Sequence, residues 1–229
     1  MTENDRRTRP GAHQFPHRLD ALVAGIAILM LWPLLLALAA AVRLDSRGPV
    51  IYREERLGKG GQPFKIYKFR TLHPQSGANP PVAASDDPRI TRLGTWIRPV
   101  HLDELPQLFN ILRGEMRFVG PRPTKAELWE SVDNDLRRRT LAFAPGLTST
   151  ASIRFNCEDD VLAETMDPVQ AYRDVVFPAK VAIDVRHFEN RRRWSDLKVM
   201  LATARTVIGK RGDRNCRRRL ERLLSRKDL

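Results

Sequence analysis

The sequence predicts an α+β protein in which a membrane segment precedes a small, mostly helical domain carrying a short β-hairpin. Three observations support this class. Residues 21–42 form one apolar run, two strand-like segments joined by a glycine-rich turn follow it, and most later segments space their apolar residues as helices do. The 229 residues, 42% of them hydrophobic and 29% charged, suit one packed domain with an appended segment.

The apolar run from Ala21 to Val42 contains no charged residue. As a helix, its 22 residues would measure about 33 Å, enough for a bilayer core of about 30 Å. A cleaved signal peptide fits less well, because its apolar region usually has about 7–15 residues.

Pro33 lies near the middle of this run and leaves two arrangements open. Proline removes a backbone donor, so residues 21–32 and 33–42, each about 15–18 Å long, could form a hairpin that enters and leaves on one side. Both flanks are basic, with eight Lys/Arg in residues 43–70, which favours the cytoplasm for both ends. The alternative is a single span with a tolerated proline kink.

Val50–Arg56 and Pro63–Arg70 are predicted as two strands joined through residues 58–61. In the second strand, Lys68 and Arg70 end a face that is otherwise apolar. These two cations either reach water from the strand end or bind phosphate.

The remainder is predicted as helices and loops, beginning with a loop over residues 73–88. We expect short helices over 90–98 and 102–112, a charged helix over 125–142, an extended or looped segment over 145–153, a helix opening at Asp167-Pro168, and a last helix capped by Ser195 with Leu197, Leu201, Ala204 and Ile208 on one apolar stripe.

The net charge of +13 indicates an anionic partner: nucleic acid, a phospholipid surface or a phosphorylated substrate. The tail from Lys210 to Leu229 holds nine Lys/Arg and three acids. It fits either a helix on an anionic membrane surface or a solvated basic tail. The only two cysteines, Cys157 and Cys216, exclude a disulfide-scaffold fold and, without a C-x-x-C pair, a cysteine zinc site.

Residues 98–107 carry the candidate chemistry. A proline at the start of the next helix places Asp103 and Glu104 at or just before its N-terminus, where acids are stabilised. An ordinary helix cap explains such a pair without any function. Beside the cations Arg98 and Arg122, however, the pair could bind a divalent metal or supply a nucleophile to a phosphate. The residues therefore predict a phosphate-handling site next to a membrane.

Other function classes have less support. The patterns of P-loop, dinucleotide-binding, zinc-protease and serine-hydrolase sites are missing from the sequence. Aromatic residues make up only 7% and no nucleic-acid motif occurs, so we expect no nucleic-acid partner. The alternative to an enzyme is a non-catalytic, membrane-anchored basic protein that binds lipid or nucleic acid.

Five segments, in order, resemble the bacterial sugar transferases, in particular the minimal form of the monotopic phosphoglycosyl transferases, which make polyprenyl-diphosphate-linked sugars. The similarity extends from about Leu19 to about Gly209. The segments are Phe64–Thr71, Asp87–Gly94, Leu102–Leu108, Asn110–Met116 and Val119–Pro123.

The resemblance implies a membrane-embedded helix-break-helix hairpin, broken at Trp32-Pro33, followed by a mostly helical cytosolic domain with a short β-hairpin and interfacial helices. Trp32 departs from the serine usual at that position. The implied organisation is a basic N-terminal arm (1–18), the re-entrant helix (19–43), the catalytic domain (44–209) and a basic C-terminal tail (210–229). The implied location is the bacterial inner membrane, with the catalytic domain on its cytoplasmic face.

The resemblance also implies the reaction: transfer of sugar 1-phosphate from a UDP-sugar to undecaprenyl phosphate, with release of UMP and a requirement for Mg²⁺. Asp103 would be the nucleophile that forms a phosphosugar-aspartyl intermediate. Glu104 would help to hold the metal or deprotonate the lipid phosphate. Substrate phosphate would be bound by four cations: Arg98, Arg122, Lys68 and Arg70.

This would be the first membrane step of exopolysaccharide or glycoconjugate biosynthesis, with membrane lipids as further partners. A homodimer and a monomer both stay open. His101 stands where the family usually has Ser or Thr, a change that we expect to alter sugar choice rather than abolish the reaction.

Overall fold

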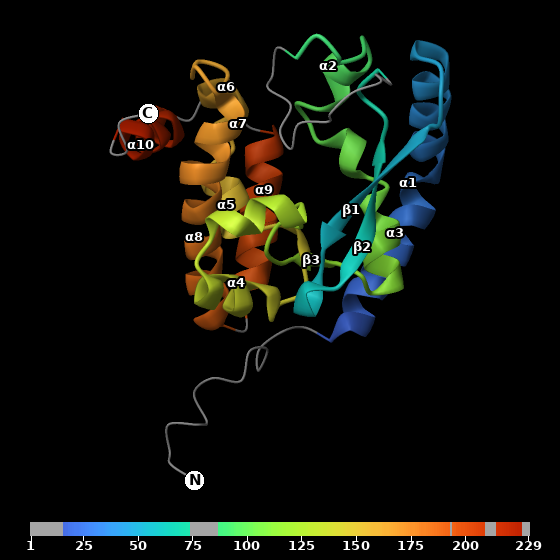
Figure 1. Ribbon diagram of the computed structural model, residues 1–229. Coiled ribbons are helices and arrows are strands. Elements are labelled where there is room, and N and C mark those ends of the chain that lie inside the picture. Colours follow the sequence, from blue (N-terminus) through green and yellow to red (C-terminus); the bar gives the residue numbers. More distant parts are fainter. Residues whose placement is uncertain (1–15, 74–86, 193, 209–213, 226–229) are drawn as a thin grey trace.

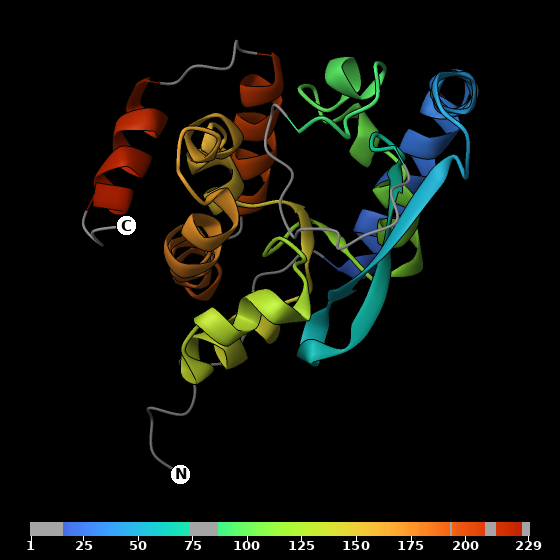
Figure 2. The same cartoon turned by 45° about the horizontal axis from the view of Figure 1, so that its top comes forward.

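The computed structural model describes residues 16–73, 87–192, 194–208 and 214–225 and shows a mixed helix-and-strand fold. The long helix α1 (His17–Asp45) lies along one side of the molecule, next to the β1–β2 hairpin and α3, and a layer of helices that includes α8 and α9 forms the other side (Figure 1). In the turned view, α10 lies beyond this layer, on the side away from α1 (Figure 2). The α+β composition predicted from the sequence is confirmed.

α1 is one continuous helix with Pro33 inside it. The break at Trp32-Pro33, and the helix-break-helix hairpin that depends on it, are therefore wrong, and of the two arrangements left open by the sequence the single helix with a tolerated proline is the one observed. Proline removes one backbone hydrogen bond, which a long helix tolerates when its side chains are held by neighbouring elements. Apolar residues on both sides of Pro33 pack against the domain: Ala24, Ala27, Ile28 and Leu31 before it, and Leu35, Leu38, Ala39 and Val42 after it.

The opposite face of α1 is apolar and exposed. Leu22, Leu29, Met30, Trp32 and Leu36 are each at least 57% exposed. Among the described residues, α1 is the one helix long and apolar enough to cross a membrane, judged by length and composition. An apolar surface of this extent is poorly solvated by water, which agrees with the prediction that this segment lies in a membrane.

The predicted hairpin is confirmed. β1 (Ile51–Leu57) and β2 (Pro63–Phe69) pair antiparallel with Glu54 opposite Ile66. The turn between them needs two residues with positive φ, and glycines 60 and 61 supply them with φ of 69° and 74°. A second, parallel pair joins β3 (Arg117–Val119) to β4 (Gly146–Thr148).

The remaining elements are short helices, several of them close to their predicted positions. They are α2 (Gly94–Ile97), a 3₁₀ turn (Leu102–Glu104), α3 (Gln107–Arg113), a 3₁₀ helix (Ala126–Ser131), α4 (Asn134–Leu141), α5 (Thr150–Arg154), α6 (Glu158–Leu162), α7 (Pro168–Ala171), a π-helix (Tyr172–Val176), α8 (Phe177–Glu189), α9 (Ser195–Ile208) and α10 (Arg214–Ser225).

Two predicted segments differ from the structure because local caps divide them. The single helix expected over 125–142 is interrupted at Asp133, whose carboxylate accepts hydrogen bonds from the N–H groups of Asp135 and Leu136 and starts α4 there. The extended segment expected over 145–153 ends at β4, because the Ser149 hydroxyl caps α5. The helix predicted to open at Asp167-Pro168 is confirmed.

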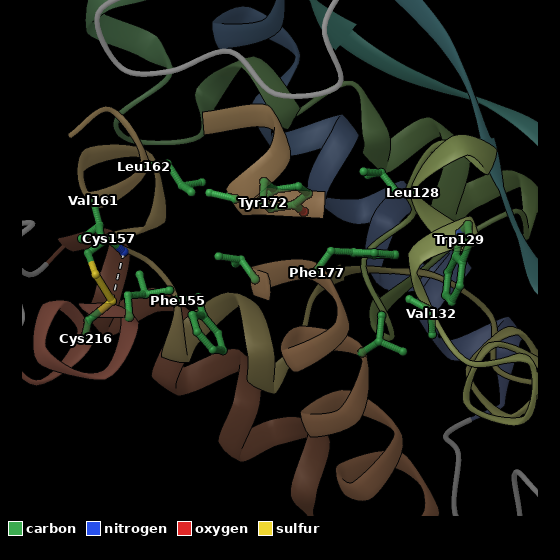
Figure 3. Packing of buried hydrophobic residues seen from close by; sticks show 14 residues of the cluster. Leu128, Trp129, Val132, Phe155, Cys157, Val161, Leu162, Tyr172, Phe177 and Cys216 are labelled. Atoms are coloured by element: carbon green, nitrogen blue, oxygen red, sulfur yellow. Dashed lines mark hydrogen bonds between the residues drawn. A yellow bond between two sulfur atoms is a disulfide. The ribbon is translucent and has the colours of Figure 1, made fainter. Parts of the chain in front are cut away.

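The main hydrophobic core lies in the helical layer. Tyr172 and Phe177 lie in its middle, between Trp129 on one side and the pair Cys157 and Cys216 on the other (Figure 3). The Trp129 and Phe177 rings meet edge to face with centroids 5.2 Å apart. This core joins the 3₁₀ helix Ala126–Ser131 to the segments that run from α5 to α8.

α9 turns the predicted apolar stripe outward. Leu197 and Leu201 are 43% and 53% exposed and Ala204 is exposed as well, while Val199 is buried. The Ile208 side chain lies outside the described residues. The predicted last helix is confirmed, and its orientation is set by the buried Val199 and by Thr203, whose hydroxyl lies 2.7 Å from that of Thr148. Ser195 is the first residue of α9, and its hydroxyl donates to the Arg192 carbonyl instead of capping.

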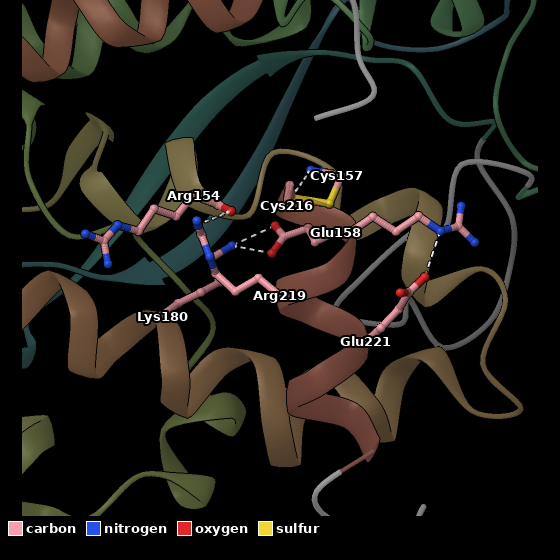
Figure 4. The surroundings of a disulfide bond; sticks show 8 residues. Arg154, Cys157, Glu158, Lys180, Cys216, Arg219 and Glu221 are labelled. Atoms are coloured by element: carbon pink, nitrogen blue, oxygen red, sulfur yellow. Dashed lines mark hydrogen bonds and ion pairs between the residues drawn. A yellow bond between two sulfur atoms is a disulfide. The ribbon is translucent and has the colours of Figure 1, made fainter. Parts of the chain in front are cut away.

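α10 packs its apolar residues on the protein itself. Cys216 and Leu220 are 1% and 0% exposed in the main core, and Cys216 forms a disulfide with Cys157 (Figure 4). Neither a helix with its apolar side on a membrane nor a solvated tail describes residues 214–225, because the apolar side is already buried. Residues 210–213 and 226–229 of the predicted tail lie outside the described residues.

Candidate active site

The two candidate acids lie in the 3₁₀ turn that precedes α3, and both are buried. Asp103 is 7% exposed and Glu104 is 6% exposed. Pro106 directly precedes α3, so the acids lie just before the helix, as predicted. His101, immediately before the turn, is the one non-glycine residue with positive φ (55°) among the described residues. Such a backbone is strained but tolerated by histidine better than by most residues.

Glu104 is the centre of an ionic cluster. Its Oε1 accepts a hydrogen bond from Lys68 Nζ at 2.7 Å and another from Arg122 Nη2, and its Oε2 accepts from Arg122 Nη1 at 3.3 Å. The guanidinium therefore binds the carboxylate through both of its oxygens. Burial would raise the pKa of Glu104, but Arg122 and Lys68 outweigh it and hold that pKa well below its usual range.

The pKa of Asp103, the residue directly before Glu104, shifts in the opposite direction. Burial raises the pKa of its carboxyl to about 6; Lys68 opposes the rise, Glu104 adds to it, and Arg98 and Arg122 oppose it. Two neighbouring carboxyls with their pKa values pushed apart are a common feature of sites that divide chemical roles between two acids. At neutral pH both are mainly ionised, and Asp103 is the one closer to protonation.

Of the four predicted phosphate-binding cations, Lys68 and Arg122 contact Glu104, and Arg98 interacts electrostatically with Asp103. Lys68 and Arg122 keep 23% and 32% of their side-chain surface exposed, so a phosphate can reach them. Arg98 Nη1 also lies 3.5 Å from the Thr71 hydroxyl.

Arg70 does not join this cluster. Its guanidinium is buried and donates to the Ser46 carbonyl at 2.7 Å, to the Ser46 hydroxyl and to the Pro49 carbonyl, where it holds the end of α1 against the hairpin. β2 ends at Phe69, so the period-two pattern that placed Arg70 beside Lys68 no longer applies at residue 70. The role of Arg70 as a phosphate ligand remains a prediction without a supporting contact.

Asp103 and Glu104 are also the predicted metal ligands. In the part of the chain that the structure describes, no group of three or more His, Cys, Asp or Glu side chains could hold a metal. Mg²⁺ commonly binds through only one or two carboxylates, with waters and substrate phosphates completing its shell. The adjacent carboxylates fit that donor set, although Glu104 would share its oxygens with Lys68 and Arg122.

Sequence reasoning missed Asn110, which fixes the relative position of α3 and β2. Its Oδ1 accepts from the Tyr67 N–H at 3.1 Å, and its Nδ2 donates to the Lys65 carbonyl at 2.8 Å and to Glu115 at 2.7 Å. The side chain is 0% exposed. The available signal was an amide side chain among the apolar residues of the predicted helix, because an amide that is buried needs hydrogen-bond partners.

Sequence reasoning also missed a second buried charge cluster in the helical layer. Lys180 and Asp184 occupy core positions of α8, between Phe177, Val181, Val185 and Phe188. Lys180 Nζ donates to both oxygens of Glu158 at 2.6 and 2.7 Å. The available signal was the helical spacing: Lys180 and Asp184 stand on the face of the helix where the i, i+3 and i+4 pattern would place apolar residues.

Comparison with known proteins supports the family resemblance that the sequence motifs indicated. The sequence model of the family described as "Bacterial sugar transferase" matches residues 12–210. A protein of Xanthomonas campestris pv. campestris, "UDP-glucose:undecaprenyl-phosphate glucose-1-phosphate transferase", is 36% identical over 201 residues, covering 84% of this chain and 38% of that protein.

Two further relatives differ in length. A Caulobacter vibrioides protein with the same name is 35% identical over 193 residues, covering 83% of this chain and 68% of that protein. The "Exopolysaccharide production protein ExoY" of Rhizobium meliloti is 32% identical over 232 residues, covering 93% of each. The chain thus spans well under half of the Xanthomonas protein and nearly all of ExoY.

Proposed function

The chain belongs to the bacterial sugar transferase family, and from this premise we propose that it transfers sugar 1-phosphate from a UDP-sugar to undecaprenyl phosphate. The relatives are named for this reaction or for exopolysaccharide production. One observation in this chain supports the proposal. Two buried carboxylates, Asp103 and Glu104, lie in one cluster with partly exposed cations that can bind a phosphate.

In the first proposed step, an Asp103 carboxylate oxygen attacks the phosphorus that carries the sugar. A new aspartyl O–P bond forms, the bond to the bridging oxygen breaks, and UMP leaves with that oxygen and its electron pair. The ionised state of Asp103 at neutral pH supports this role, since its carboxyl has a pKa of about 6.

In the second proposed step, an oxygen of undecaprenyl phosphate attacks the same phosphorus. The aspartyl O–P bond breaks, Asp103 recovers its carboxylate, and the product is an undecaprenyl-diphosphate sugar. Dividing the transfer into two displacements lets one carboxylate serve both substrates in turn. Glu104 is proposed either to help hold the metal or to accept the lipid phosphate proton; the second role requires the substrate phosphates to draw Lys68 and Arg122 away from its carboxylate, because these cations hold its pKa well below the usual range.

Lys68, Arg98 and Arg122 are proposed to bind the phosphate oxygens in both steps. Charge neutralisation and in-line placement are the main protein contributions to phosphoryl transfer. Mg²⁺, held by Asp103 and Glu104, would supply further neutralisation of the donor phosphates. Arg122 is stiffened by prolines on both sides, which favours a fixed position for its guanidinium.

The acceptor is a membrane lipid, and the exposed apolar face of α1 supports a position in the membrane where that lipid is found. We propose the bacterial inner membrane, with the site on the cytoplasmic face, where UDP-sugars occur. The reaction would begin an exopolysaccharide or glycoconjugate. A non-catalytic lipid-binding protein would not need two acids buried at the edge of a cationic cluster, because buried carboxylates are costly.

The test is UMP release by purified protein in detergent with Mg²⁺, undecaprenyl phosphate and a panel of UDP-sugars. Asp103→Asn should abolish release, while Asp160→Asn, an exposed aspartate on α6, should leave it unchanged. In the absence of lipid, wild type should release at most one UMP per protein and gain the mass of one phosphosugar on the peptide that contains Asp103. Equal UMP release by Asp103→Asn would contradict the proposed nucleophile, and no release from any donor would contradict the function.

A further inference from the structure

A groove of about 360 Å³ lies between the turn of the β1–β2 hairpin and α4, which lie side by side in Figure 1. Among the described residues, it is lined by the turn and by one side of α4 with the residue that follows this helix: Gly60, Asn134, Arg137, Arg138, Leu141 and Ala142. Pockets that bind small molecules commonly measure about 300–1,000 Å³. The groove is therefore large enough for a small ligand such as a mononucleotide or a sugar phosphate.

This groove is separate from the candidate active site. In the hairpin, Leu57 pairs with Pro63 next to the turn, while Lys68 of the ionic cluster pairs with Tyr52 near the other end. Along β2, the distance from Pro63 to Lys68 is about 17 Å at the usual rise of a strand. The residues that line the groove take no part in the cluster around Glu104. A ligand in the groove would therefore be bound in addition to the substrates of the proposed reaction.

Both charged side chains that line the groove are cations, and no acid among the described residues lines it. Within the part of the chain that the structure describes, the Arg137 guanidinium has no hydrogen-bond or ion-pair partner. Arg138 pairs with Asp135 at 2.6 Å, but the two side chains are 81% and 52% exposed, and such a surface pair is weak. Both guanidinium groups are therefore available to an anion that enters the groove.

The other walls of the groove suit the uncharged part of a ligand. Leu141 and Ala142 are apolar, and Leu141 also supports the turn, because a Cβ added at Gly61 would lie 3.8 Å from Leu141 Cδ1. A Cβ added at Gly60 would have no neighbour within 4 Å, so the turn leaves the groove open on its side. The amide of Asn134 can both donate and accept a hydrogen bond. An apolar wall with one amide at its edge is suited to a sugar or a base.

We propose that this groove binds a small phosphate-bearing molecule, either a nucleotide or a sugar phosphate. Its phosphate is bound by the guanidinium groups of Arg137 and Arg138, which carry a permanent charge and match the geometry of phosphate oxygens. Its ring lies against Leu141 and Ala142, with a polar edge at Asn134. Nucleotides and sugar phosphates share these two parts, a phosphate and a ring with polar substituents.

The test is isothermal titration calorimetry of the full chain in detergent, with UMP as one probe and glucose 1-phosphate as the other. The titrations use Lys68→Gln, because both probes could also bind at the candidate active site, where this change removes a partly exposed cation. Lys68→Gln should bind at least one probe with a Kd below about 1 mM, and the probe that binds more tightly identifies the source of the ligand. If neither probe binds, the proposal is wrong.

Removing the two cations assigns the bound probe to the groove. Arg137→Gln/Arg138→Gln, introduced into Lys68→Gln, should raise the Kd at least tenfold, because charge-assisted hydrogen bonds to the phosphate are lost. The matched control Arg218→Gln/Arg222→Gln removes two exposed charges from α10 and should leave the Kd unchanged. A Kd that Arg137→Gln/Arg138→Gln does not change would overturn the proposal, because the probe would then be bound elsewhere.

Ala142→Leu tests the apolar wall without changing any charge. A larger side chain at this position reduces the space for the ring, so the Kd in the Lys68→Gln background should rise several-fold while the Tm stays near that of Lys68→Gln. An unchanged Kd would contradict the placement of the ring against this wall. These outcomes do not depend on the proposed function: its failure would appear as a lack of UMP release by wild type, and the Kd values would still decide whether the groove binds a phosphate-bearing ligand.

Discussion

Among the described residues, two of the clusters of acids and cations differ in how far they open to solvent: the one around Glu104 and the one around Lys180. At the candidate site, Asp103 and Glu104 are covered while Lys68 and Arg122 keep 23% and 32% of their side-chain surface exposed. In the helical layer, Lys180 has only 6% of its side chain exposed. The first cluster exposes its cations to solvent, and the second keeps its cation almost entirely buried.

This difference separates a site that can exchange partners from one that cannot. An anionic substrate can replace part of the Glu104 interactions, because the cations reach solvent and outnumber the acids they bind. The Lys180 ammonium is bound by both oxygens of Glu158 inside the core, so no ligand can compete for that cation, although Glu158 itself keeps 21% of its side-chain surface exposed. The location of exposed charge, more than the presence of buried charge, therefore distinguishes the candidate site from the other cluster.

The largest expected effect comes from removing a cation of the open cluster. Arg122→Ala should lower kcat/KM for the UDP-sugar by about a thousandfold, since it removes phosphate binding and leaves Glu104 with one cation fewer. Lys180→Met in the closed cluster should cost about tenfold or less. UMP release at varied UDP-sugar concentration measures both values. Similar losses in the two variants would remove the functional distinction between the clusters.

The next largest effect concerns the disulfide that links α10 to the start of α6, directly before Glu158. Cys157 and Cys216 are 59 residues apart in the sequence. A bond that closes such a loop stabilises a folded protein by about 2–4 kcal/mol. Reduction by dithiothreitol should therefore lower the Tm of wild type by several degrees.

The matched control for this prediction is the double variant Cys157→Ala/Cys216→Ala. Its Tm should resemble that of reduced wild type and should not respond to the reductant. A wild-type Tm that is the same with and without dithiothreitol would show that α10 is held by Leu220 and its neighbours in the core, and not by the disulfide.

Local motifs were sufficient to predict the open cluster but not the closed one. Lys68, Glu104 and Arg122 lie in short segments whose residue types already suggest phosphate chemistry, and the structure brings these segments together. Arg70 was assigned to the same group because a period-two pattern does not reveal where a strand ends. Its guanidinium holds the end of α1.

The missed features all depend on tertiary packing. Residues 21–42 left a broken hairpin and a single helix with a tolerated proline both open, and the contacts on both sides of Pro33 that accompany the continuous α1 have no local signal in that segment. The pairing of Cys157 with Cys216 requires α10 to fold back on α6. Lys180 could have been recognised from its position on the apolar face of α8, but its partner Glu158 lies 22 residues away.

A smaller effect should come from Asp184, the other acid of the closed region. Burial raises the pKa of its carboxyl to about 7, while hydrogen bonds from the Ala151 N–H and the Ser149 hydroxyl oppose the rise. Because the folded pKa exceeds the unfolded value, the native state holds an extra proton between the two, and the free energy of unfolding falls as pH rises through that window. The expected loss is on the order of 2 kcal/mol between pH 5 and pH 8.

Asp184→Asn tests this directly, since an amide oxygen can still accept the Ala151 N–H and carries no charge. The variant should lack this part of the pH dependence and be more stable than wild type at pH 8, as measured by chemical denaturation at both pH values. A variant whose stability changes with pH as steeply as wild type would assign the dependence to other groups.

The smallest expected effect is a shift in the pH dependence of kcat/KM, which follows from the raised pKa of Asp103 in the open cluster. If Asp103 attacks as a carboxylate, kcat/KM should fall about tenfold per pH unit below pH 6, since the carboxyl has a pKa of about 6, and should level off above it. Glu104→Gln removes the neighbouring negative charge that raises the pKa of Asp103. It also frees Lys68 and Arg122 from the Glu104 carboxylate that they bind in the wild type. With Glu104 neutral, both cations act on Asp103 alone, so the remaining activity should keep its plateau to lower pH. An acid limb that does not move in Glu104→Gln would assign the titration to a group other than Asp103.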